Sequence, residues 1–82
     1  MINFAAVKET AQRYSQDIAN FTSDLVKIKS LDSQEGEAVK RVKQEMEKLE
    51  FDEVRIDPFG NVIGRMGSGK TVVALDAHVD TV

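Results

Sequence analysis

The residues best suited to chemistry lie at 75–82, which read LDAHVDTV. His78 is the only histidine in the chain, and Asp80 follows it by two positions. In an extended strand, side chains at i and i+2 lie on one face, so His78 and Asp80 are predicted to lie side by side. An imidazole at a strand end, with a carboxylate that fixes its tautomer, is typical of one half of a metal site.

A lone histidine near a strand end is more often structural than a metal ligand. Three features favour the ligand interpretation of His78. It follows an apolar strand, whose carboxyl end is where open α/β sheets bind ligands. Asp80 lies on the same face, and no other residue of the chain competes for the role. Asp76 is interpreted as a structural carboxylate or one at the rim of this metal site. The alternative is that it takes part in the site.

Residues 3–29 are predicted to form one long helix, because apolar side chains recur at alternating spacings of three and four. These side chains are Phe4, Val7, Ala11, Tyr14, Ile18, Phe21, Leu25 and Ile28. They form one stripe, which is typical of a helix packed on a core. The same spacing would also suit the seam of a coiled coil.

A second helix is predicted at about 34–49. Asp32 or Ser33 would cap it, and Asp32 with Glu35 has the form of a capping box. Its predicted inward-facing residues are Val39, Val42, Met46 and Leu49.

Beyond residue 50 the apolar period changes from 3.6 to 2, which predicts strands at 52–57, 62–66 and 71–77. The turn between the first two is at 57–61, and a glycine-rich turn at 67–70 precedes the third. The third strand is apolar on both faces, as in strands buried inside a parallel or mixed sheet. The prediction is therefore an α/β fold, with two N-terminal helices followed by three strands. Two helices cannot cover both faces of such a sheet, so further elements would be needed.

Residues 64–71, GRMGSGKT, match the phosphate-loop pattern G-x-x-x-x-G-K-[ST]. A working phosphate loop opens a helix, whose N-terminal amides hold the phosphates. The residues that follow are apolar and β-branched at consecutive positions, which favours a strand. A glycine-rich turn between two strands, with Lys70 exposed, is the preferred interpretation.

Composition sets limits on the function. A chain of 82 residues is at most one small domain. The net charge of −3 and the lack of a basic patch argue against nucleic acid as a partner. No apolar run approaches the roughly 18 residues of a membrane span, and the first residues do not read as a signal peptide. Cysteine is absent, which excludes thiolate ligands and fits a reducing compartment, so a cytoplasmic location is predicted.

Residues 75–82 resemble the first metal-binding signature of the M-twenty metallopeptidases. This family includes acetylornithine deacetylases, succinyl-diaminopimelate desuccinylases and aminoacylases. The order of features upstream is also similar: a long first helix ending in LVKIKS at 25–30, a second helix, DPFGNVI at 57–63, a glycine turn and an apolar strand. The resemblance covers the whole chain, and residues 45–82 are most similar to the branch of selenium-metabolism-linked hydrolases.

The resemblance implies that His78 binds one of two zinc or cobalt ions and that Asp80, counted with the catalytic residues, supports it. It implies that residues 1–82 are the N-terminal, incomplete part of a zinc-peptidase-like mixed-sheet catalytic domain. The other ligands, the glutamate base and a substrate-binding and dimerisation domain would then lie beyond residue 82, and the parent would be a homodimer. The family's metal pair activates water for attack on an amide.

Three hypotheses follow. In the first, the chain belongs to a metal-dependent amidohydrolase that cleaves C–N bonds of N-acyl amino acids or short peptides, and is inactive as a fragment. In the second, it has a non-enzymatic role and associates with other chains through its first helix or open strand edges. In the third, the glycine turn binds a nucleotide.

Overall fold

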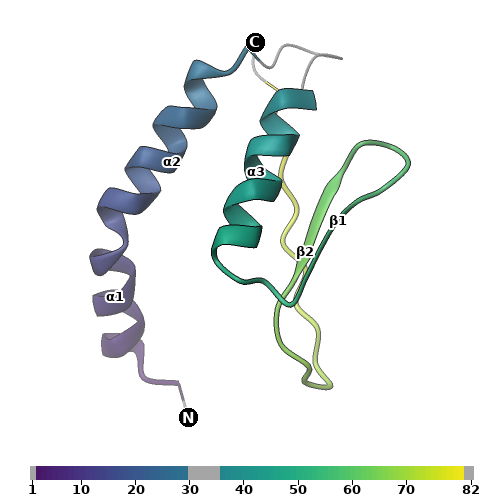
Figure 1. Ribbon diagram of the computed structural model, residues 1–82. Helices are drawn as coiled ribbons and strands as arrows, with labels where there is room; N and C mark the ends of the chain where they lie inside the picture. The colour runs from purple at the N-terminus through teal and green to yellow at the C-terminus, as the bar shows by residue number, and fades with distance from the viewer. Residues whose placement is uncertain (1, 30–35, 81–82) are drawn as a thin grey trace.

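The computed structural model describes residues 2–29 and 36–80 and has a mixed α/β architecture (Figure 1). The helices are α1 (Phe4–Arg13), α2 (Ser15–Lys27) and α3 (Gly36–Lys48). Strands β1 (Glu53–Ile56) and β2 (Val62–Arg65) form an antiparallel hairpin. Helix α3 lies between α2 and the hairpin and contacts both of them, so it is the centre of the described fold.

The prediction of one helix over 3–29 is wrong, because the helix is interrupted at Tyr14. Asn3 caps α1, and its side chain accepts a hydrogen bond from the Ala6 amide at 3.1 Å. The Tyr14 amide is shared between the carbonyls of Thr10 and Ala11, at 3.3 and 3.2 Å, as is common at helix ends. Helix α2 then begins at Ser15 without a side-chain cap.

The apolar stripe of the first two helices is only partly covered. In the described chain α1 contacts α2 but neither α3 nor the hairpin. Four stripe residues are therefore exposed, namely Phe4, Val7, Tyr14 and Ile18. The other large members, Phe21, Leu25 and Ile28, are half-buried where α2 approaches α3. The predicted packing of this stripe is confirmed only for the second half of α2.

The core of the described fold lies on α3, where Ala38 and Val39 are 1% and 6% exposed. Val42 and Met46 are half-buried, but Leu49 is 52% exposed, so its predicted inward position is wrong. The reason is that α3 ends at Lys48 and the chain reverses just beyond it. Glu50 has a left-handed backbone with φ of 61°, and the Phe51 amide returns to the Met46 carbonyl at 3.1 Å, as at a Schellman-type helix end.

The predicted start of this helix at 34 and its caps at Asp32, Ser33 and Glu35 lie outside the described residues.

Gly64 allows the hairpin to approach α3 closely. It pairs with Val54 in the antiparallel register. A Cβ atom at this position would lie 2.7 Å from both Met46 Sδ and Phe51 Cδ2, far inside normal contact distance. The absence of a side chain is therefore what lets β2 pack on α3.

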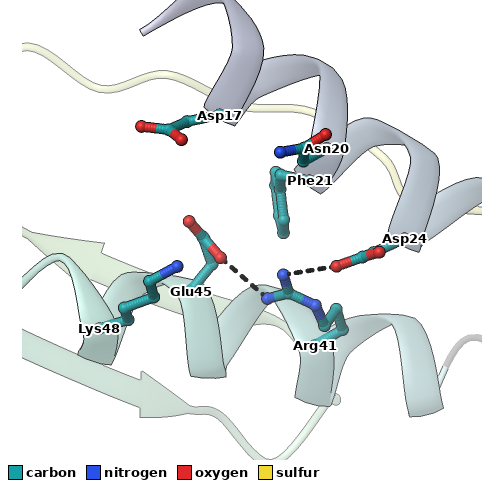
Figure 2. A pocket seen from close by; sticks show the side chains of 7 residues that line it. All are labelled: Asp17, Asn20, Phe21, Asp24, Arg41, Glu45 and Lys48. Carbon is teal, nitrogen blue, oxygen red and sulfur yellow. Dashed lines mark hydrogen bonds and ion pairs between the residues drawn. The ribbon is translucent and has the colours of Figure 1, made fainter.

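Arg41 of α3 joins this helix to α2 (Figure 2). Its Nη2 donates to Asp24 Oδ2 at 2.9 Å, and its Nη1 donates to Glu45 Oε1 at 3.0 Å. The guanidinium carbon lies 4.9 Å from the centre of the Phe21 ring, within range of a cation–π interaction. The hydrogen bonds to Asp24 and then to Glu45 raise the pKa of Arg41 above its ordinary value, so its charge is secure.

Arg41→Ala is expected to lower the melting temperature by a few degrees, because it removes two contacts of α3 with α2, to Asp24 and to the Phe21 ring, together with the ion pair to Glu45 within α3. The melting temperature of Arg41→Lys should lie between those of wild type and Arg41→Ala, since an ammonium keeps the charge but cannot reproduce the planar fork of the guanidinium. The measurement is thermal unfolding followed by circular dichroism, with Lys40→Ala, at an exposed position on the same helix, as the control. Equal melting temperatures for Arg41→Ala and Lys40→Ala would show that the Arg41 contacts do not hold α2 on α3.

The hairpin turn is organised by the carboxylate of Asp57. Its Oδ1 accepts from the amides of Phe59 and Asn61, both at 2.9 Å, and its Oδ2 accepts from Asn61 Nδ2 at 3.0 Å. Gly60 in the same turn has φ of 88°, which glycine adopts without strain. The turn predicted at 57–61 is confirmed, and so are strands close to the predicted ranges 52–57 and 62–66.

The hydrogen bonds from the Asn61 side chain and then from the Asn61 and Phe59 amides lower the pKa of Asp57. The stabilisation from this carboxylate is therefore present above the unfolded-state value of about 4. It is lost as the pH falls through the lower pKa of the folded state. Urea unfolding should give wild type a larger free energy of unfolding than Asp57→Ala at pH 7. The difference between the two free energies should become smaller below about pH 4. A gap that stays constant between pH 7 and pH 2 would contradict this role.

The strand predicted at 71–77 is absent from the structure. Residues 66–80 form neither helix nor strand, and Val72, Val73 and Leu75 are 84%, 81% and 95% exposed. The physical reason is that a strand needs a partner, and in the described chain β2 pairs only with β1. The described fold thus has three helices and two strands where the sequence predicted two helices and three strands.

No helix within 2–29 or 36–80 is long and apolar enough to cross a membrane.

Candidate metal centre

Gly67 is the point at which the chain leaves the hairpin and turns towards His78. Its φ is 87°, a left-handed conformation that favours glycine. The Gly67 amide donates to Asp52 Oδ2 at 2.6 Å, and the Gly67 carbonyl accepts from Arg65 Nη1 at 2.6 Å. Arg65 also pairs with Glu53, with Nε 3.4 Å from Oε1. Beyond this point the yellow segment in Figure 1 turns back past the hairpin.

This geometry argues against the phosphate-loop interpretation of residues 64–71. The described residues that follow the loop, up to Asp80, are not helical, so the loop does not open a helix. The Gly67 amide, one of the donors that a phosphate would need, already binds the carboxylate of Asp52. Lys70 is exposed, as predicted. The segment is a glycine-rich turn, although no third strand follows it.

His78 and Asp80 are joined by a hydrogen bond. His78 Nδ1 lies 2.9 Å from Asp80 Oδ1 and 3.2 Å from the Asp80 carbonyl oxygen. Both partners only accept hydrogen bonds when the carboxylate is ionised, so Nδ1 must carry the proton. In the neutral imidazole, Nε2 then has the free lone pair that a metal ion needs. The side chain of His78 is 85% exposed, so Nε2 is accessible.

The described chain does not hold a complete metal site. No three side chains of His, Cys, Asp or Glu come together within residues 2–29 and 36–80. Asp76 is exposed, and no hydrogen bond joins it to His78 in this part of the structure, which fits the rim interpretation. Thr81 and Val82, the end of the sequence signature, lie outside the described residues. The structure therefore brings together one imidazole and one carboxylate.

Sequence reasoning missed the two residues that hold Gly67. Asp52 is separated from Gly67 by 15 positions along the chain and belongs to no recognisable motif. Arg65 occupies one of the unspecified positions of the phosphate-loop pattern, so its residue type carries no signal there. The sequence carries only a weak indication of these contacts. A glycine-rich turn after a strand needs hydrogen bonds to hold its backbone, and charged residues that could supply them flank the turn. The contact of Arg41 with Asp24, 17 positions apart, was missed for the same reason.

Comparison with known proteins finds two long relatives. The chain is 48% identical over 81 residues to an uncharacterized protein, YgeY, of Escherichia coli strain K12. The identity with the uncharacterized protein YgeY of Escherichia coli O157:H7 is the same. Each alignment covers 99% of this chain but only 20% of the relative, so the chain spans about a fifth of the length of these proteins. No family model and no solved structure matches the chain.

Proposed function

We propose that this chain is part of a metal-dependent hydrolase that cleaves C–N bonds of N-acyl amino acids or short peptides. In this proposal His78 binds one of two zinc or cobalt ions, and Asp80 orients its imidazole. The observation that carries the proposal is the hydrogen bond between His78 Nδ1 and Asp80 Oδ1 at 2.9 Å. The resemblance of residues 75–82 to the first metal-binding signature of the M-twenty metallopeptidases supplies the reaction class.

The residues present fit the role of one ligand with its support. Zinc and cobalt both accept imidazole nitrogen, and metal-bound histidines usually donate their second ring N–H to a carboxylate or carbonyl. Asp80 accepts the hydrogen bond from Nδ1–H here, which holds the ring in one tautomer and leaves Nε2 for the metal. When bound, a metal pair would polarise the scissile carbonyl and lower the pKa of a bound water.

The exposed apolar segment supports placement in a larger domain. Val72, Val73 and Leu75 are more than four-fifths exposed. Leaving such side chains uncovered forfeits roughly 1.5–3 kcal/mol each. In the proposal, residues 1–82 are the first part of a zinc-peptidase-like mixed-sheet catalytic domain, in which this segment becomes a covered strand. The remaining ligands then come from other parts of the polypeptide, and the 82-residue chain alone is inactive.

The proposal also includes the substrate, the location and the assembly of the enzyme. Its substrate is a small amide or peptide, and neither nucleic acid nor membrane is a partner. Its location is cytoplasmic, which fits a chain without cysteine. Its assembly is a homodimer.

The test is hydrolysis by the full polypeptide that carries these residues. The protein is freed of metal with a chelator, reloaded with Zn²⁺ or Co²⁺, and assayed against N-acetyl and N-succinyl amino acids and dipeptides. The proposal expects turnover only in the reloaded protein. A folded, reloaded protein that cleaves none of these and retains no metal would overturn it. Turnover by the isolated 82-residue chain would overturn the claim that this part is inactive alone.

A second candidate is a non-enzymatic chain that associates with other chains. It is favoured by the exposed apolar residues of α1 and by the two open edges of the hairpin. Sedimentation of the 82-residue chain distinguishes the candidates. A folded, monodisperse monomer would eliminate association as its role, whereas a defined oligomer without metal affinity would favour this candidate over the hydrolase.

A further inference from the structure

In the part of the chain that the structure describes, the apolar side of α1 and of the start of α2 is uncovered. Its large side chains are between 49% and 77% exposed, and they are Phe4, Val7, Tyr14 and Ile18. Helix α1 contacts only α2, and in Figure 1 it extends past the end of α3. We call this surface the α1 face.

The α1 face has the relief of a docking surface. It contains a shallow, mainly apolar hollow, and the residues that line the hollow are Ala6, Val7, Thr10 and Ala11. Phe4 and Tyr14 lie on the same stripe, one helical turn before Val7 and one turn after Ala11. Small residues between larger ones form a groove that accepts projecting side chains of a neighbouring element.

The charges of the two helices argue against a membrane surface as the occupant of the α1 face. From residue 4 to residue 27 the chain carries three basic and three acidic residues, so the helices have no net charge. Helices that lie on membrane surfaces are typically rich in Lys and Arg on their polar side. The occupant that fits is therefore an apolar protein surface.

The long relatives favour an occupant from the same polypeptide. Their 48% identity extends over all but one residue of this chain and so includes α1, while about four-fifths of each relative lies outside the alignment. Two surfaces linked in one polypeptide meet at an effective concentration on the order of millimolar for a short flexible link. This is far above the concentration of a second chain in dilute solution. A cover within the polypeptide therefore outcompetes a second copy of similar intrinsic affinity.

We infer that the α1 face is the docking surface for an apolar helix or sheet face of the same, longer polypeptide, from outside residues 1–82. The inference shares with the proposed function the placement of this chain in a longer polypeptide, but it needs neither the metal nor the reaction. It assigns α1 to the interior of one folded molecule and not to an interface between chains.

The first test compares Val7→Asp with Gln12→Asp in the full polypeptide. Both positions are exposed in the described fold, and Gln12 lies on the polar side of α1. A carboxylate against an apolar cover is unfavourable, so amide hydrogen exchange of α1 should be at least about tenfold faster in Val7→Asp than in wild type. Gln12→Asp should stay within about threefold of wild type. The helix dipole favours an acid near the start of α1, so it works against the expected difference.

Equal exchange rates in the two variants would overturn the inference, because Val7 would then face water as Gln12 does. If Val7→Asp fails to fold, Val7→Ser and Gln12→Ser repeat the comparison. Neither measurement uses metal or turnover, so a failed hydrolysis assay and a failed docking surface are distinguishable. A natural product with the 9.1 kDa mass of the 82-residue chain would also overturn it.

The second test identifies the occupant directly. A photoreactive phenylalanine analogue is incorporated in place of Phe4 in the full polypeptide, and equal amounts of ¹⁴N- and ¹⁵N-labelled protein are mixed before irradiation. We expect cross-links to residues outside 1–82, with each linked pair carrying a single isotope. Pairs of mixed isotope would overturn the inference in favour of a second copy. Reaction with water alone would show that the α1 face is uncovered, and would overturn it as well.

Discussion

Replacing His78 with alanine is expected to remove metal binding and to lower amide hydrolysis by more than about 100-fold. Loss of a group that only orients a metal ligand typically lowers metal affinity or activity by about 10–100-fold. A larger loss is expected here because His78 is proposed as the ligand itself. The measurement combines metal content by mass spectrometry with turnover of N-acyl amino acids by the full polypeptide.

Two nearby carboxylates provide matched comparisons for His78→Ala. Asp80→Asn should reduce metal affinity by about 10–100-fold, because a side-chain amide accepts a weaker hydrogen bond from Nδ1 than a carboxylate does. Asp76→Ala should have little effect, since this exposed residue has no hydrogen bond to His78 in the described structure. An unchanged metal content in His78→Ala would contradict the assignment, whatever the activity of the variant.

Gly64→Ala is expected to cost about 1–3 kcal/mol of folding free energy, the usual penalty for overpacking. The new Cβ would lie 2.7 Å from both Met46 Sδ and Phe51 Cδ2, so both side chains would have to move. The methionine is flexible, but the phenylalanine ring is part of the contact between the helix end and the hairpin. The loss of folding free energy is measured by urea unfolding of wild type and variant, both fitted with the same m-value.

Gly69→Ala is the control for Gly64→Ala. A Cβ at Gly69 would meet nothing within 4 Å, and its backbone is not left-handed, so its stability should change by less than about 0.5 kcal/mol. If Gly64→Ala proved as stable as Gly69→Ala, β2 would not pack on α3 as closely as the structure shows.

Local patterns predicted the local elements well. The switch of apolar period after residue 50 correctly gave a helix followed by a hairpin, and the DPFGN sequence correctly gave its turn. The pairing of His78 with Asp80 also followed from spacing, because side chains two positions apart share a face in an extended chain. Each of these features depends on residues close together in sequence.

Features that depend on distant residues were not predicted. The break at Tyr14 could not be inferred, because the apolar stripe continues across it. In the described chain α1 contacts neither α3 nor the hairpin, and its residues are exposed. The strand expected at 71–77 has the right composition but no described partner with which to form a ladder. The hydrogen bond from the Gly67 amide to Asp52 joins residues 15 positions apart, and no periodicity links them.

The most direct test of the central claim is the nitrogen spectrum of the His78 imidazole during a Zn²⁺ titration of the full polypeptide. His78→Ala assigns its signals by their loss. We expect a protonated Nδ1 throughout, hydrogen-bonded to Asp80, and a shift of the Nε2 signal from its free to its metal-bound position as Zn²⁺ is added. An Nε2 signal that does not move at saturating Zn²⁺, in a folded protein, would show that His78 is not a metal ligand.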